Sequence, residues 1–185
     1  MKLRMIAIFA VYTTIFVLLC TGCSSETVLD NLDKTRTALE DIAGGKVDAE
    51  EEILCKGNLN DFVYMLSSRQ GADACVYLSS LNFAIVEETY DQLMNDPNNA
   101  ELNKRLINEI TAAVFDKDIG INYDTISEMK FRFKEMTMVG ENIRAKCYMI
   151  NNGIRYDVIV RWTVDDSKSM AGIDFANLES ILLDD

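Results

Sequence analysis

Few residues of this chain have the types and spacing that chemistry needs, and the first are two cysteines near its start. Cys20 and Cys23 form a Cys-x-x-Cys pair directly after an apolar run. Such a pair can be a redox couple, part of a metal site, or a processing signal. A redox pair belongs at the start of a folded helix, and the chain has no histidine to help bind zinc. The position of the pair therefore favours the processing signal.

The segment before Cys23 has the parts of an export signal. Lys2 and Arg4 give a basic start, and residues 5–19 carry no charge and are mostly apolar. The uncharged run is short for a membrane span, which needs about 20 apolar residues. We therefore predict a signal peptide over residues 1–22.

Cys20-Thr21-Gly22-Cys23 resembles the lipobox of bacterial lipoproteins, where Leu-x-Gly/Ala-Cys is cut before the cysteine and its thiol is lipidated. Cys20 stands where leucine is usual. The resemblance implies that Cys23 carries the lipid, that residues 23–27 are a tether, and that the protein is anchored to the cell membrane or the outer membrane, facing the periplasm or the exterior. An uncleaved anchor and plain secretion are the alternatives.

Charge narrows the set of partners. The chain has a net charge of −12, and without residues 1–22 it keeps 16 basic and 30 acidic side chains. Binding to nucleic acid depends on Lys and Arg that neutralise phosphates, so a nucleic-acid partner is not expected. Adhesion to anionic lipid by charge is not expected either, which leaves the lipid on Cys23 as the membrane attachment. The expected partner is an envelope protein or an apolar ligand.

Three further cysteines lie in the body of the chain: Cys55, Cys75 and Cys147. Export to an oxidising compartment would permit a disulfide. Cys55 and Cys75 flank a short predicted helix and are the expected pair. Cys147 falls on the apolar face of a predicted strand, where a thiol packs as a small core residue.

Patterns for a nucleophile, a metal or a cofactor are not found. A serine or cysteine nucleophile normally uses a histidine base, and phosphate-loop and dinucleotide-binding motifs are absent. Residues 116–124, DKDIGINYD, alternate polar side chains as calcium loops do. Ile121 and Ser127, however, stand where an EF-hand has glycine and glutamate. We expect an ordinary polar loop, and no catalytic residue, metal or cofactor.

The elements that position any site begin with helices. Apolar spacing predicts them over residues 27–43, 48–55, 58–68, 72–95 and 97–115. Lys56-Gly57-Asn58 is expected to separate the second helix from the third. The fourth, with Val76, Leu81 and Ile85 spread around it, is expected to be central and largely buried. Asp96 and Pro97 are the expected N-cap and first residue of the last.

After about residue 127 the chain is rich in strand formers, and Asn152-Gly153 is a strong hairpin signal. A two-residue turn there pairs residues whose numbers sum to 305. A second turn at Gly140-Glu141, with a β-bulge near Lys134-Glu135, adds Phe131, Phe133, Met136 and Met138 to the same face. Residues 170–183 predict a last strand and a short tail. The hairpin has an apolar face made of Ile143, Ala145, Cys147, Met149, Tyr156, Val158, Val160 and Trp162.

This order predicts one α+β domain over residues 28–185, with N-terminal helices packed on one face of a C-terminal antiparallel β-meander. Lys56-Gly57-Asn58-Leu59 and Ala171-Gly172-Ile173-Asp174-Phe175, within that order, resemble the cystatin-like superfamily of nuclear transport factor and ketosteroid isomerase over roughly residues 48–180. That superfamily contains binding modules and enzymes, so the resemblance implies a fold and carries over no catalytic residue.

Two functions fit this sequence. Met149, Tyr156 and Trp162 could line a pocket on the concave face of the sheet, although the core of an α+β domain has the same composition. The expected function is a non-enzymatic binding or interaction module. The alternative is a small enzyme that uses a carboxylate base in an apolar pocket. An exposed apolar patch would favour the first, and a carboxylate with a raised pKa inside a cavity the second.

Overall fold

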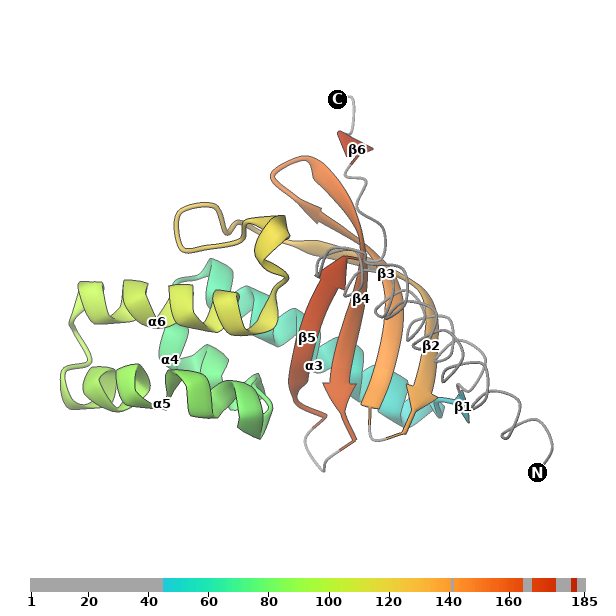
Figure 1. The fold of residues 1–185 in the computed structure, drawn as a ribbon, viewed down its shortest axis with the longest axis horizontal. Coiled ribbons are helices and arrows are strands. Elements are labelled where there is room, and N and C mark those ends of the chain that lie inside the picture. Colours follow the sequence, from blue (N-terminus) through green and yellow to red (C-terminus); the bar gives the residue numbers. More distant parts are fainter. Residues whose placement is uncertain (1–44, 141, 165–167, 176–180, 183–185) are drawn as a thin grey trace, which may run out of the picture. The chain divides into compact units, whose positions relative to one another are not determined.

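The computed structural model describes residues 45–140, 142–164, 168–175 and 181–182. An antiparallel sheet packs one face against α3, while α5 and α6 lie beside the β5 edge (Figure 1). The predicted α+β architecture, helices followed by a β-meander, is confirmed. The predicted signal peptide, Cys23, the tether and the helix over residues 27–43 lie outside the described residues.

Helix α3 (Ala49–Ser67) has Asp48 as its N-cap, and the Asp48 side chain accepts a hydrogen bond from the Glu51 N–H. The predicted break at Lys56-Gly57-Asn58 was wrong, because the helix runs through it. Glycine inside a helix costs about 1 kcal/mol relative to alanine. That cost is small beside the burial of a continuous stripe against the sheet, formed by Cys55, Leu59, Phe62, Val63 and Leu66.

The helix predicted over residues 72–95 is interrupted. It forms α4 (Gly71–Ala74), the 3-10 turn η1 (Cys75–Tyr77) and α5 (Ser80–Asn95). The interruption at Leu78-Ser79 comes from a contact distant in sequence, since the Ser79 N–H donates to the Met170 carbonyl oxygen at 3.0 Å. The Ser79 side chain then caps α5 by accepting from the Asn82 N–H.

Helix α6 (Ala100–Val114) starts three residues later than predicted. Its N-cap is Asn99, which accepts from the Leu102 N–H at 3.1 Å, while Asp96 is the C-cap of α5 and Pro97 lies in the connection. The predicted end near Phe115 is confirmed. A short 3-10 turn, η2 (Lys117–Ile119), follows.

The sheet is a meander with one early strand added to its edge. Strand β1 (Gly45–Lys46) pairs with β2. The predicted last strand forms as β5, and a further short strand, β6, stands where a tail was predicted. The order is β1-β2-β3-β4-β5, with β6 pairing with β4. The other strands are β2 (Lys130–Val139), β3 (Asn142–Asn151), β4 (Ile154–Thr163), β5 (Met170–Phe175) and β6 (Ile181–Leu182).

The predicted register is confirmed. Pairs from Asn142 with Thr163 to Asn151 with Ile154 follow the sum of 305, and the register between β2 and β3 shifts between Phe133 and Glu135, at the predicted bulge. Asn152 has a φ of 51° and Gly153 a φ of 75°, as a hairpin turn with two left-handed residues requires. All eight residues of the predicted apolar hairpin face are buried.

Candidate binding site

The three cysteines of the body are free thiols, and the predicted Cys55–Cys75 disulfide is not formed. Cys75 Sγ turns to the Gly71 carbonyl oxygen, to which it donates at 3.4 Å. Burial raises the pKa of each of the three thiols to about 12. A thiol that stays protonated at neutral pH is a poor nucleophile, so these cysteines are core residues.

The predicted pocket on the sheet is filled. Met149 and Trp162 are fully buried, and Tyr156 is 9% exposed. Trp162 stacks on Phe133, with ring centroids 6.5 Å apart, and Tyr156 lies against Phe175 at 5.9 Å. These side chains are packing residues of the core, and the hollow described below does not include them.

The polar loop over residues 116–124 uses its side chains on its own backbone. Asp116 accepts from the Asp118 N–H, and Asn122 Oδ1 accepts from the N–H groups of Asp124 and Thr125. Gly120 has a φ of 69°, which glycine adopts without strain. Within the described ranges, no three His, Cys, Asp or Glu side chains gather as metal ligands would.

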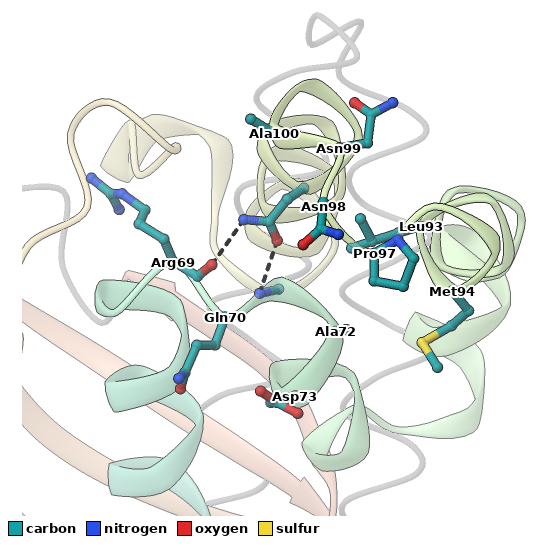
Figure 2. A pocket seen from close by; sticks show the side chains of 12 residues that line it. Arg69, Gln70, Ala72, Asp73, Leu93, Met94, Pro97, Asn98, Asn99 and Ala100 are labelled. Carbon is teal, nitrogen blue, oxygen red and sulfur yellow. Dashed lines mark hydrogen bonds between the residues drawn. The ribbon is translucent and has the colours of Figure 1, made fainter.

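A hollow of about 290 Å³ opens where α4, the end of α5 and the start of α6 meet (Figure 2). Its wall combines apolar side chains with amides and one carboxylate. Sequence reasoning did not find it, because its residues come from three separate segments. The apolar, amide and carboxylate side chains of this wall are those of Gln70, Asp73, Leu93, Met94, Asn98 and Asn103.

Asn103 holds the wall of this hollow together. Its Nδ2 donates to the Arg69 carbonyl oxygen at 2.8 Å and its Oδ1 accepts from the Gly71 N–H at 3.2 Å, as the dashed lines of Figure 2 show. A Cβ at Gly71 would lie 2.8 Å from Asn103 Oδ1, so a larger residue would force the Asn103 side chain out of its hydrogen bonds. The connection between α3 and α4 is thereby fixed to α6.

The chemistry available in the hollow is hydrogen bonding with some apolar contact. The Arg69 guanidinium points away from the hollow in Figure 2 and stacks on Tyr123, with Cζ 4.4 Å from the ring centroid. Asp73 is the charged group that remains in the wall. Asp73 is exposed, whereas a carboxylate that serves as a general base is usually tuned by burial, so this wall is better suited to binding than to catalysis.

The helical layer, residues 49–114, also carries apolar side chains on its outside. Leu81 is 81% exposed, Val76 70% and Ile85 64%, which corrects the prediction that these three lie in a buried central helix. The sequence did contain the signal, because a helix with apolar residues all round must be covered on every side or leave some exposed. The others with large exposure are Ile53, Leu54, Tyr64 and Met94, of which Met94 also lines the hollow.

Comparison with known proteins gives no family for this chain: no family model matches it, and no curated protein does. In the part of the chain that the structure describes, no helix combines the length and the apolar character that a membrane span needs. Similarity to other proteins therefore assigns no substrate or partner here.

Proposed function

We propose that this protein is a lipid-anchored protein of the bacterial cell envelope whose α+β domain is a non-enzymatic binding module. The anchor rests on Cys20-Thr21-Gly22-Cys23 and the basic, then apolar, segment before it. The binding role rests on one observation, the exposed apolar side chains of the helical layer.

The exposed apolar side chains of the helical layer do not contribute the stabilisation that their burial would give. Burying a leucine or isoleucine side chain is worth about 1.5–3 kcal/mol, so Leu81 and Ile85 leave that stabilisation unused. The two residues are one helical turn apart and lie on the same side of α5. Grouped apolar side chains on a surface are typical of a contact with another molecule.

The enzymatic alternative has less support. It requires an apolar cavity with a carboxylate base, and the apolar face of the sheet is filled by its own side chains, with Met149, Val160 and Trp162 fully buried. The hollow beside α4 is lined by amides and one carboxylate, Asp73. A ligand held there would be bound through hydrogen bonds rather than transformed.

Site-specific photocrosslinking in native membranes tests the binding role. A photoreactive amino acid would replace Leu81 in the full chain, and Ala112, an exposed residue of α6, would be the matched control position. We expect one discrete crosslinked product from position 81 and none from position 112. Products that are equal at both positions, or absent from both, would contradict the binding role.

A further inference from the structure

Helix α5 has an unusual composition for a surface helix. Its sequence, SLNFAIVEETYDQLMN, contains no lysine or arginine and three acidic residues: Glu87, Glu88 and Asp91. Within the described residues, no basic side chain forms an ion pair with any of the three. The negative charge of α5 is therefore open to a partner.

The two sides of α5 are clearly separated. The buried side consists of Asn82, Val86, Thr89 and Leu93, whose spacing of three and four residues is that of one helix face. The same spacing places the exposed residues on the opposite face. We name this face the α5 stripe, and its members are Leu81, Ala84, Ile85, Glu88, Asp91 and Gln92.

The α5 stripe changes character along the helix axis. Leu81, Ala84 and Ile85 form its apolar first half, and Glu88 and Asp91 form its acidic second half. At 1.5 Å per residue the whole stripe is about 17 Å long. This length matches about three turns of another helix, and an amphipathic helix presents its contact residues at positions i, i+3, i+4 and i+7 over such a length.

We propose that the α5 stripe docks a basic amphipathic helix of a partner protein. The apolar side chains of that helix would pack on Leu81 and Ile85, and its lysines or arginines would pair with Glu88 and Asp91. Complementary charge sets the orientation and speeds the encounter, while the apolar contact supplies most of the affinity. This inference rests on the proposed binding role and names the surface and the class of partner.

Charge disfavours the other candidates for this surface. A second copy of the chain would bring another strongly acidic protein, with its own Glu88 and Asp91, to the stripe. An anionic lipid surface would repel the same two carboxylates. A basic amphipathic helix could pack on the apolar half of the stripe and form ion pairs with its acidic half.

A designed peptide provides a direct probe. It would be an 18-residue helix of leucine and lysine, with leucines at positions i, i+3, i+4 and i+7, labelled for fluorescence anisotropy. The protein would be the full chain in phosphatidylcholine nanodiscs, with empty nanodiscs as the blank. We expect saturable binding that weakens with salt, at least tenfold tighter than binding of a scrambled peptide of equal composition.

Matched charge reversals locate the site. Glu88→Lys with Asp91→Lys should weaken peptide binding at least tenfold and confer binding of a leucine–glutamate peptide. Glu128→Lys with Asp118→Lys, two acidic residues outside α5, makes the same change in net charge and should alter binding less than twofold. Equal losses in both variants would overturn the proposal, because they would mean attraction by net charge alone.

The remaining outcomes separate this inference from the proposed function. Peptide binding that survives Leu81→Ser with Ile85→Ser would overturn the stripe as the site. If the wild-type protein self-associates in sedimentation and the Leu81→Ser, Ile85→Ser variant does not, the occupant is a second copy of the chain. That result would overturn the proposal that the partner is a basic helix.

If the lysine peptide does not bind while the crosslink from position 81 persists, the binding role stands and the partner chemistry proposed here is wrong. If that crosslink is also absent, the binding role itself fails.

Discussion

Burial decides the chemistry of single residues in this protein. Cys55, Cys75 and Cys147 are exposed by 4% or less, and their thiols face the apolar core. The sequence located Cys147 correctly, because a strand alternates its faces with a period of two. It could not decide between a disulfide and free thiols for the other two, since that depends on how α3 packs beside η1.

Thiol alkylation checks this assignment. At pH 8 these thiols remain protonated, because burial raises the pKa of each to about 12. Iodoacetamide should therefore modify none of the three in the folded full chain and all three in urea without reductant, as counted by mass spectrometry. Modification of only Cys147 in urea would show that Cys55 and Cys75 are paired after all.

Val160 tests the buried face of the hairpin. Its side chain is fully buried between the paired residues Ala145 and Ile173, so Val160→Asp should cost about 4 kcal/mol by burying an unpaired charge. Arg132→Asp, on the exposed side of β2, should cost less than about 1 kcal/mol. Urea midpoints of the two variants measure the difference, and equal losses would contradict the register.

Arg161 shows why a neutral control cannot be chosen from alternation alone. By register it lies on the polar face, next to Val160, and looks replaceable. In the fold its guanidinium forms an ion pair with Asp174 on β5. An aspartate at this position would face another carboxylate, which is why Arg132 is the better comparison.

Two glycines act in opposite ways at the scale of the helices. Gly57 lies inside α3, and a Cβ added there would have no neighbouring atom within 4 Å, so Gly57→Ala should stabilise the fold by about 0.5–1 kcal/mol through helix propensity. At Gly71 a Cβ would press on Asn103 Oδ1 and on Ile107 at 3.1 Å, so Gly71→Ala should destabilise it by about 1–3 kcal/mol.

Thermal or urea unfolding of the two alanine variants, side by side, measures both effects. Each variant is the other's control, since the substitution is the same and only the surroundings differ. Stabilisation by Gly71→Ala would contradict the close packing of α6 against the α3–α4 connection, and destabilisation by Gly57→Ala would contradict an open position in a continuous α3.

The elements that could be predicted were those specified by nearby residues. The turn at Asn152-Gly153 and the alternation beside it determine the register of β3 and β4, and the bulge follows from the positions of Phe131 and Phe133. The errors in the helices arose where distant contacts decide. The Ser79 N–H donates a hydrogen bond to the Met170 carbonyl oxygen, and this contact ends one helical segment. Burial of the apolar side of α3 keeps that helix continuous through Gly57.

At the scale of the molecule, the sequence indicated a binding module but not where it binds. Exposure of Leu81 and Ile85 depends on which side of α5 packs against the remaining helices and the sheet. Because α5 has apolar residues on both sides, its buried side could not be predicted from the sequence. The hollow held by Asn103 likewise forms only when residues near 70, 94 and 103 come together.

The proposed anchor makes its own prediction for the whole molecule. Metabolic labelling with palmitate should mark the wild-type protein and not Cys23→Ala, and fractionation should move the variant out of the membrane pool. Two or more acyl chains give stable attachment, whereas a single chain is marginal. Cys20→Ala, which changes a residue of the predicted signal peptide, should keep the label, and equal labelling of wild type and Cys23→Ala would rule out this anchor.

The central claim is that the α5 stripe serves a partner and not the fold. The most direct measurement is the urea midpoint of the full chain carrying Leu81→Ser and Ile85→Ser, purified without any partner. Since both side chains are mostly exposed, we predict a free energy of unfolding within about 0.5 kcal/mol of wild type. A loss of about 2 kcal/mol or more would contradict the claim, because it would mean that the chain itself covers these residues.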